Sequence, residues 1–282
     1  MSKRARIIAV AAISVPILLT AWAFVVEPGR LVVREISLPL PAWTSRLKVA
    51  VVADLHIGAP HVGPDKLRTI VAEVNDQHPD IVVLLGDFVI GGPNGGEGVP
   101  GGTMITAARI AVELQQLNPP LGVYAVLGNH DWWYGAKNVY DSLTNVGIQV
   151  LENEAVRIEH KTGAFWLGGI ADLWSSNPDI EATLEQTTAG EPVLLITHNP
   201  DIFPDVPARV SLTMAAHTHG GQVQLPFIGA LVKTSEHGYN QGHFVENGRH
   251  LFVTSGIGTS IYPVRFGVPP EIVILNLEPM RP

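Results

Sequence analysis

An apolar run ends in two side chains that can bind a metal ion in the stretch LKVAVVADLH, residues 47–56. Residues 47–53 show no strict alternation of polar and apolar side chains, which is typical of a strand that is covered on both faces. Asp54 and His56 then stand at the carboxyl end of this strand. Because open α/β sheets bind ligands at the carboxyl ends of their strands, the stretch predicts an α/β fold and the place of its site.

The same arrangement recurs along the chain. The apolar runs 81–85, 123–127, 193–196 and 210–215 are followed, in that order, by Asp87, by Asn129-His130-Asp131, by His198 and by His217 with His219. Each motif alone could be a polar turn or a helix cap, but their order and spacing together indicate a site. We therefore expect these side chains to converge along one rim of a sheet.

The residue types of this set restrict the metal. The chain contains no Cys, and imidazole nitrogens combined with carboxylate and amide oxygens suit Mn²⁺, Zn²⁺ or Fe better than Ca²⁺ or Cu(I). Two divalent ions about 3.5–4 Å apart, sharing one carboxylate, would use more ligands than one tetrahedral ion. The candidate ligands are Asp54, His56, Asp87, Asn129, His198, His217 and His219.

The ordered series D-x-H, G-D, G-N-H-D, H and H-x-H resembles the calcineurin-like metallophosphoesterase superfamily over about residues 47–278. The resemblance implies a four-layer α/β/β/α sandwich, in which two mixed sheets are flanked by helices. It also implies that one metal ion is held by Asp54, His56 and His219, that Asp87 bridges, and that a second ion is held by Asn129, His198 and His217.

His130 is not a ligand in that superfamily. The resemblance implies that it lies beside the scissile phosphate and stabilises or protonates the leaving oxygen. Asp131 is expected to orient His130 by accepting a hydrogen bond from its other ring nitrogen.

The last His pair departs from the superfamily in one position. Ala216 stands where the family commonly has Gly, which concerns only the local backbone, because Ala tolerates positive φ less well. His217 and His219 would point to opposite faces of an extended segment. We expect the following Gly220-Gly221 to supply the bend that brings both rings to one site.

The implied activity is hydrolysis of a phosphodiester or phosphomonoester by a hydroxide that bridges two metal ions. Residues 217–222 and 269–272, together with the amino terminus, most resemble the bacterial membrane-associated phosphodiesterase branch that includes the YaeI and YkuE proteins. Some relatives of that branch hydrolyse UDP-2,3-diacylglucosamine in lipid A synthesis, so a pyrophosphatase of that type is an alternative. A noncatalytic metal-binding scaffold and an Fe or Mn redox protein are alternatives from other classes.

The amino terminus predicts a membrane anchor. Residues 1–6 form a basic tail, and residues 7–26 are apolar and carry no charge, which is enough to span a bilayer as a helix. A cleavable signal sequence is the alternative, because Ala21-Trp22-Ala23 resembles a cleavage site. The basic tail places the amino terminus in the cytoplasm. We therefore expect a single-pass protein of a bacterial inner membrane with its catalytic domain outside the cytoplasm.

The rest of the chain divides into a tether, residues 27–46, and one domain, residues 47–282. The domain should contain helices at 64–77, 103–117 and 139–146, strands at 165–170 and 272–277, a Gly-rich rim or lid at 91–102, and a hairpin turn at Asn247-Gly248.

The net charge of the chain restricts the class of substrate. The net charge is −8 at pH 7, so a nucleic acid is not expected as substrate. We expect a phosphoester, lipid-linked or of the cell envelope, and the membrane itself as partners.

Trp132, Trp133 and Tyr134 either form a wall of the substrate cleft or pack in the core. Among the histidines outside the motifs, His61 could line the entrance.

Overall fold

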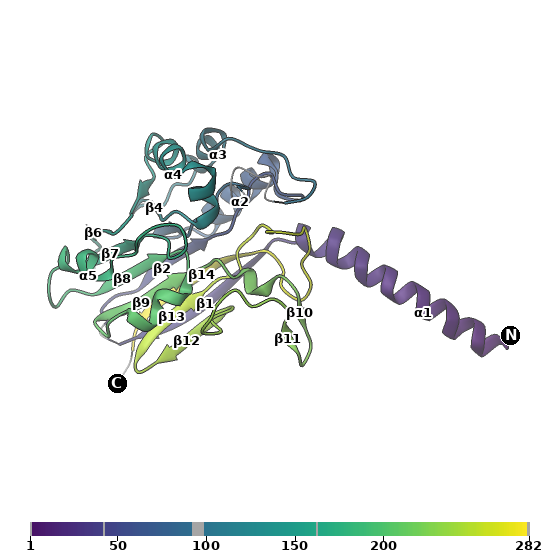
Figure 1. The fold of residues 1–282 in the computed structure, drawn as a ribbon. Coiled ribbons are helices and arrows are strands. Elements are labelled where there is room, and N and C mark those ends of the chain that lie inside the picture. Colours follow the sequence, from purple (N-terminus) through teal and green to yellow (C-terminus); the bar gives the residue numbers. More distant parts are fainter. Residues whose placement is uncertain (1, 42, 92–98, 162, 281–282) are drawn as a thin grey trace.

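Two facing six-stranded sheets form the domain, and one long helix projects from it (Figure 1). This computed structural model describes residues 2–41, 43–91, 99–161 and 163–280. The first sheet has the order β1-β14-β2-β3-β4-β5, and the second has the order β12-β13-β9-β8-β7-β6. Both sheets contain parallel and antiparallel pairs, so the predicted pair of mixed sheets is confirmed.

The strands and helices have the following bounds. The first sheet contains β1 (Val32–Leu40), β14 (Glu271–Pro279), β2 (Leu47–Val52), β3 (Ile81–Leu84), β4 (Val123–Ala125) and β5 (Gln149–Val150). The second contains β12 (Gly242–Glu246), β13 (Arg249–Val253), β9 (Val210–Ala215), β8 (Val193–Thr197), β7 (Phe165–Ile170) and β6 (Glu154–Ile158). The main helices of the domain are α2 (Pro64–Asp76), α3 (Ala107–Leu114), α4 (Asn129–Thr144) and α5 (Ile180–Glu185).

Strand β2 explains why its sequence does not alternate. Val49 and Val51 are buried between the two sheets, whereas Ala50 and Val52 are buried with Ile70 of α2 on the outer face of the first sheet. Both faces of the strand are therefore apolar, and fully burying each Val side chain stabilises the fold by about 1.5–3 kcal/mol. Helices α2, α3 and α4 cover this outer face, and α5 lies against the outer face of the second sheet.

Most of the predicted helices and strands are present, although some begin or end at residues other than those predicted. The β2-α2-β3 unit is confirmed, with β2 and β3 parallel. The helix predicted at 103–117 begins at Ala107, because Thr106 is extended and its side chain accepts a hydrogen bond from the Arg109 amide. The helix predicted at 139–146 is the second half of the longer α4, which is kinked at Gly135.

The structure tests the prediction of a hairpin turn but hardly tests that of a Gly-rich rim or lid. The turn between β12 and β13 is confirmed, with positive φ at both Asn247 (51°) and Gly248 (76°), as a tight hairpin turn requires. The rim or lid predicted at 91–102 falls largely on residues 92–98, which lie outside the described residues.

The prediction of a tether over residues 27–46 is wrong for its central part. Val32–Leu40 forms strand β1, which pairs with β14 in parallel along its whole length. The prolines suggested an irregular segment, but Pro39 stands on the edge strand of the sheet, where a missing N–H is tolerated. The folded domain therefore begins before residue 47.

The amino-terminal helix stands apart from the domain. Helix α1 (Lys3–Ala21) continues through the π-helical turn η1 (Trp22–Val26) and the 3₁₀ turn η2 (Glu27–Gly29). The stretch Lys3–Gly29 is long and apolar enough to cross a membrane, and only 6% of its apolar window is buried in the domain. This is the exposure expected of a helix whose surroundings are lipid rather than protein.

Candidate active site

The site lies where the carboxyl ends of strands from both sheets meet. Strands β2, β3 and β4 of the first sheet lead into Asp54, Asp87 and Asn129, and strands β8 and β9 of the second lead into His198 and His217. The expectation of one rim of one sheet is therefore wrong. The chain crosses to the second sheet after β5, so both sheets supply residues to the site.

Four buried side chains form a first group. The ligand atoms of Asp54, His56, Asp87 and His219 all lie within 4.8 Å of one another. His56 Nε2 is 3.1 Å from His219 Nε2 and 3.4 Å from Asp87 Oδ2.

A second group surrounds His198. Its Nε2 atom lies 3.2 Å from Asn129 Oδ1, 3.1 Å from His217 Nδ1 and 3.4 Å from Asp87 Oδ2. Asp87 Oδ2 is thus equally distant from a ring nitrogen of His56 in the first group and of His198 in the second. The structure brings all seven predicted ligands together in two groups that share this carboxylate.

These spacings fit divalent metal ions. Ligand atoms about 2.0–2.2 Å from one ion lie roughly 3–3.6 Å from each other, and the distances of 3.1–3.4 Å measured from His56 Nε2 and from His198 Nε2 fall in that range. Asp54 Oδ2 is buried and has no hydrogen-bond partner in the described part of the chain. Leaving a buried carboxylate oxygen without a partner is costly, and a cation in the first group would satisfy it.

Burial and neighbouring charges hold three of the predicted ligands in a protonation state that suits metal binding. Burial, with repulsion from other imidazoles, lowers the pKa of His56 and that of His217 to about 3. Both rings are therefore neutral at neutral pH, which is the form that binds a metal. Burial opposes ionisation of Asp87, but attraction to His198 and His130 outweighs it and holds the pKa of Asp87 well below its usual range.

The ligands occupy strained backbone. Positive φ angles of 42–69° occur at the ligands Asp54, His56, Asp87, His217 and His219. Such conformations cost roughly 1–3 kcal/mol each in residues other than Gly and concentrate at functional sites.

The bend at the last His pair therefore begins in the histidines themselves. His217 and His219 both have positive φ, and Gly220 and Gly221 continue the turn at 59° and 76°, so the prediction that the glycines alone bend the chain is incomplete. Ala216 does not have positive φ. Its replacement of the usual Gly leaves the backbone unstrained at that position.

Asp131 does not orient His130, and that prediction is wrong. Its carboxylate accepts hydrogen bonds from the backbone amides of Asp87 (2.8 Å), Phe88 (2.9 Å) and Gly128 (2.9 Å). His130 Nδ1 is buried and has no hydrogen-bond partner among the described residues. Asp131 lies at the start of α4 and its carboxylate binds the backbone of the loop after β3, so it holds the backbone of Asp87.

We expect Asp131→Asn to lower the free energy of unfolding by about 2–4 kcal/mol, because an amide NH₂ would replace one acceptor oxygen and leave buried backbone N–H groups unsatisfied. Urea unfolding of metal-depleted protein measures this change without a contribution from bound ions. The control is Asp141→Asn, a half-exposed carboxylate of the same helix that contacts Lys137. A loss no larger than the control's would contradict this role.

Two glycines allow backbone to approach the ligands closely. A Cβ atom on Gly128 would lie 2.2 Å from Asp87 Oδ1, and one on Gly256 would lie 2.4 Å from Asp54 Oδ2. Sequence reasoning found Gly128 in its motif but missed Gly256, which follows β13. The chain after β13 therefore packs directly on the first ligand of the site.

Gly256→Ala should weaken Mn²⁺ binding by at least about tenfold, since moving a group that positions a ligand typically costs 10–100-fold in metal affinity. Isothermal titration of the metal-depleted protein measures it. The matched control is Gly248→Ala in the β12-β13 turn. Gly248 also has positive φ, at +76°, but its Cβ would meet nothing within 4 Å. Equal Mn²⁺ affinities in the two variants would show that the contact with Asp54 is not the cause of any weaker binding, and that backbone strain is.

Arg265 is a second residue that sequence reasoning missed. It is fully buried, and its guanidinium donates to the carbonyls of Ser255, Gly258 and Val268. One of its nitrogens lies 3.5 Å from His219 Nδ1. Burial lowers the pKa of Arg265 to about 10, so it stays charged at neutral pH and fixes the loop that contacts Asp54. Its only signal in the sequence is a lone cation among apolar and small residues.

A cleft of about 310 Å³ opens above the ligands. Its lining residues are Asp87, Asn129, His130, Trp133, Trp174, His217, His219, Thr234, Ser260 and Ile261. Of the three aromatic residues after Asp131, Trp133 lines the cleft, whereas Trp132 and Tyr134 pack against the core. Trp174, which the sequence did not single out, stands edge-on to His217 with ring centroids 4.2 Å apart.

His61 does not line the cleft. Its Nε2 atom is 2.9 Å from the carbonyl oxygen of Phe24 at the end of the amino-terminal helix. The expectation that it lies at the entrance is wrong, because the loop after Ile57 turns away from the ligands toward that helix.

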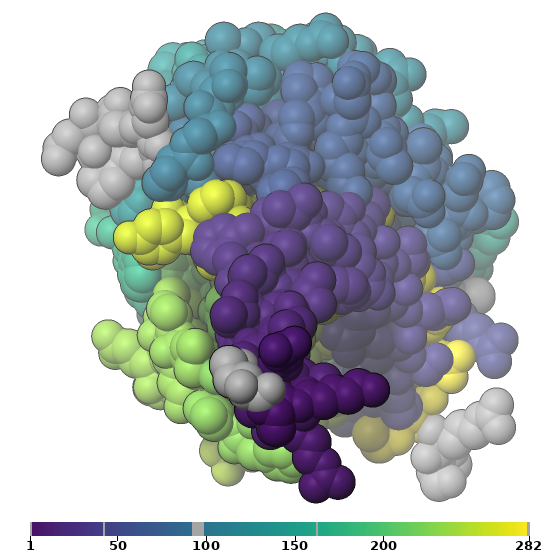
Figure 2. All heavy atoms as spheres, turned by 90° about the vertical axis from the view of Figure 1, so that its right-hand side faces the viewer, coloured from purple at the N-terminus to yellow at the C-terminus, as the bar shows by residue number. Residues whose placement is uncertain are grey.

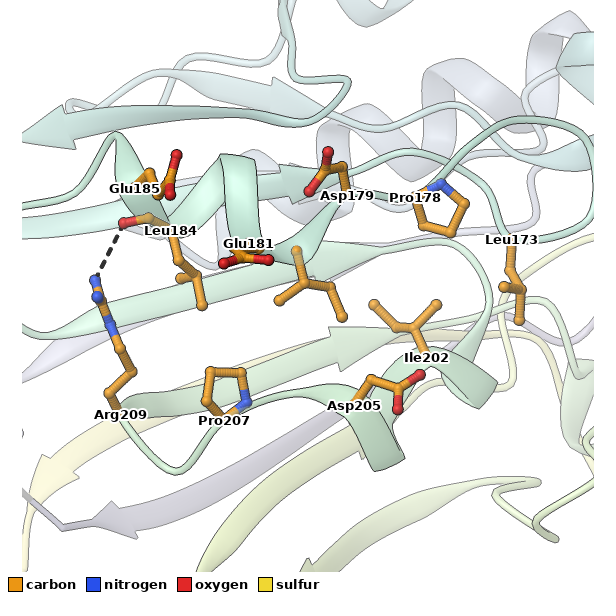
Figure 3. A pocket seen from close by; sticks show the side chains of 11 residues that line it. Leu173, Pro178, Asp179, Glu181, Leu184, Glu185, Ile202, Asp205, Pro207 and Arg209 are labelled. Atoms are coloured by element: carbon orange, nitrogen blue, oxygen red, sulfur yellow. Dashed lines mark hydrogen bonds between the residues drawn. The ribbon is translucent and has the colours of Figure 1, made fainter.

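A larger cavity of about 550 Å³ lies elsewhere, between α5 and the 3₁₀ helix η4 (Pro200–Asp205). Figure 3 shows Arg209 at one end of it, donating to the Leu184 carbonyl, and acidic side chains along its edge. The two cavities share no lining residue among those that the structure describes, so this one is separate from the candidate site.

Comparison with known proteins agrees with the geometry. The family described as calcineurin-like phosphoesterase matches residues 47–221. The chain is 30% identical over 246 residues to the uncharacterized metallophosphoesterase YkuE of Bacillus subtilis, covering 85% of this chain and 82% of that protein. It is 30% identical over 241 residues to phosphodiesterase YaeI of Escherichia coli, covering 82% of each.

More distant similarities extend to a vertebrate protein and to a solved structure. A zebrafish transmembrane protein with a metallophosphoesterase domain is 28% identical over 277 residues, covering 89% of this chain and 58% of that protein. The NAD nucleotidase of Haemophilus influenzae is 14% identical, with a TM-score of 0.48 over 75% of this chain, and this chain spans half of its length.

Proposed function

The chain belongs to the calcineurin-like phosphoesterase family, and we propose that it hydrolyses a phosphodiester or phosphomonoester with two divalent metal ions at the site described above. The observation that carries this proposal is the position of Asp87 Oδ2, which is 3.4 Å from His56 Nε2 and 3.4 Å from His198 Nε2. A carboxylate shared between two ligand groups is the arrangement that a two-metal site requires.

The residues of the chain divide the work as follows. Asp54, His56 and His219 would hold one ion, Asn129, His198 and His217 the other, and Asp87 both. When bound, Mn²⁺, Zn²⁺ or Fe ions would supply a hydroxide nucleophile at neutral pH and neutralise charge on the phosphoryl oxygens.

His130 would act on the leaving group. It lines the cleft, stands edge-on to His56 with ring centroids 4.6 Å apart, and lies 4.8 Å from the ring of Trp133. Its backbone amide donates to Asp87 Oδ1 at 2.9 Å, which fixes the start of α4 beside the bridging residue. Its Nδ1 atom has no hydrogen-bond partner among the described residues, so no carboxylate there fixes the ring, which would donate a proton to a departing oxygen.

Turnover of model substrates tests the proposal. The metal-loaded full chain should release p-nitrophenol from bis-p-nitrophenyl phosphate or p-nitrophenyl phosphate, and the ratio of the two rates gives the diesterase preference. Hydrolysis of UDP-2,3-diacylglucosamine with little activity on either would favour the pyrophosphatase alternative. Bound metals with no hydrolysis of any of the three would favour a noncatalytic scaffold, and a visible absorption or radical signature would favour a redox protein. A nucleic acid substrate is not part of this proposal.

We also propose that α1 is an uncleaved anchor of a bacterial inner membrane, with the catalytic domain outside the cytoplasm. An alkaline phosphatase reporter, which is active only outside the cytoplasm, should be active when fused after residue 282. The same fusion lacking residues 1–26 should be inactive. An inactive full-length fusion would reverse the orientation and would make the cytoplasmic lipid A precursor the leading substrate.

A further inference from the structure

Six exposed apolar side chains gather on two loops beside the site. We call them the apolar loop surface, and they are Phe227, Ile228, Leu231, Val232, Ile261 and Tyr262. Their side chains are between 55% and 108% exposed. Exposed apolar side chains in such number on neighbouring loops indicate a site of interaction with a partner or a membrane. The first loop contains the hairpin of β10 (Gln224–Leu225) and β11 (Gly229–Ala230), which extends away from the two large sheets (Figure 1).

The two loops are held together as one surface. Gln222 Nε2 donates to the Ser260 carbonyl at 3.0 Å, and Gln222 Oε1 accepts from the Ser260 amide at 2.7 Å. The backbone amide of Gln224 donates to the Phe266 carbonyl at 2.7 Å, and that of Phe266 donates to the Gln222 carbonyl at 2.9 Å. Because these bonds join both loops, their apolar side chains are presented together.

The same loops are tied to the end of the amino-terminal helix. The Arg265 amide donates to the Ala23 carbonyl at 3.0 Å, and the Val268 amide donates to the Glu27 side chain at 2.7 Å. Glu27 is only 3% exposed, so this junction is part of the folded domain and not a flexible tether. Viewed from the side of α1, the segments around residues 225–235 lie on the same face from which the helix emerges (Figure 2). The apolar loop surface therefore has a fixed position relative to the membrane helix.

The composition of these loops suits a bilayer. Residues 222–234 and 258–268 contain no Asp or Glu, in a chain that has 26 acidic residues. An exposed cation, Lys233, adjoins the apolar side chains. At the junction, Arg30 lies over the Trp22 ring at 5.7 Å, and Trp and Arg are typical of the level of the lipid headgroups. Loops with exposed apolar side chains, a cation and no acid of their own match the surface of a membrane that contains anionic lipids.

We propose that the apolar loop surface rests in the surface of the bilayer that α1 spans, so that the active-site cleft opens at the level of the headgroups. Ile261 belongs both to this surface and to the cleft lining, and Thr234 and Ser260 of the same loops also line the cleft. A phosphoester whose other ester arm is anchored in the bilayer would reach the site without leaving the membrane. The catalytic part of this inference rests on the proposed phosphoesterase function, whereas the membrane contact does not.

Label depth tests the contact directly. The chain has no Cys, so Ile228→Cys in the full chain gives a single site for an environment-sensitive fluorophore. In phosphatidylcholine vesicles with phosphatidylglycerol, we expect its emission to shift to the blue and to be quenched by lipids that carry a nitroxide on the acyl chain. The control is Val112→Cys on α3, which is 48% exposed and should remain unquenched. Equal, water-like emission from both labels would overturn the proposal, as would shielding of the first label that persists in the absence of lipid, which would indicate a protein partner.

Paired substrates test the consequence for catalysis. Bis-p-nitrophenyl phosphate and a diacylglycerol p-nitrophenyl phosphodiester in the same vesicles share a leaving group but differ in whether the other arm is in the bilayer. Phe227→Ser/Ile228→Ser should hydrolyse the first at the rate of the unaltered chain. It should lose about 10- to 100-fold on the second, because the cleft is no longer oriented toward the lipid. Equal rates of the variant and the unaltered chain on the lipid would overturn the inference. If the unaltered chain hydrolyses neither compound, the proposed function fails while label depth still decides the membrane contact.

Discussion

Asp87→Asn should remove both bound metals and turnover together. A neutral amide oxygen cannot offset the charge of two cations that share it, so metal content should fall below one ion per chain. The rate on bis-p-nitrophenyl phosphate should fall by about 10³-fold or more, the scale on which losing a key charge-stabilising group acts. Metal analysis of the purified chain and initial rates at saturating Mn²⁺ measure the two effects.

The control for this variant is Asp205→Asn, which removes a carboxylate of the separate cavity beside α5. It should leave metal content and rate unchanged. A variant at Asp87 that keeps two metals and near-normal activity would refute the bridging assignment. Loss of one metal with the other retained would show that Asp87 serves a single ion.

His130→Ala should separate catalysis from metal binding. His130 contacts the ring of His56 but is not among the ligand atoms that the described residues bring together in either group. We therefore expect both metals to remain bound and kcat to fall by roughly 10²–10⁴-fold, the range of general acid–base catalysis. The loss should be smaller for aryl phosphoesters such as those of p-nitrophenol, whose leaving oxygen needs little protonation, than for alkyl phosphoesters.

The contrast with His198→Ala sharpens this prediction. His198 lies within 3.1–3.4 Å of the other atoms of its group, so its loss should release metal as well as abolish turnover. Metal loss in His130→Ala would instead make His130 a ligand. An equal rate loss across all leaving groups would indicate that it stabilises charge on the phosphoryl group and does not donate a proton.

The ligand set could be found in the sequence because each ligand follows a strand with its own apolar signature. Strands such as β2 are buried on both faces, and this leaves a continuous apolar run that ends where the side chains must become polar. The hairpin at Asn247-Gly248 was equally visible, because few residues accept positive φ at two consecutive positions. These signals are local, and the structure confirms the strands and the hairpin turn.

Other features are set by contacts between residues far apart in the chain. The role of Asp131 depends on the amides of Asp87 and Phe88, which only the packing of α4 beside β3 brings to its carboxylate. Arg265 and Gly256 reach the site because the chain returns to it after β13. None of these has a periodicity or a spacing that a sequence motif could reveal.

The sequence by itself determined the strands, the order of the ligands, their chemistry and the apolar amino-terminal helix, because backbone propensity and hydrophobic patterning act over a few neighbouring residues. Only the tertiary structure decided that two sheets and not one supply the predicted ligands, that Val32–Leu40 is a strand and not a tether, and that the end of the amino-terminal helix is bonded to the loops beside the cleft. Those outcomes depend on pairing and burial between segments as distant as β1 and β14. Such contacts depend on the free energy of the whole fold, which cannot be derived from a short stretch of sequence.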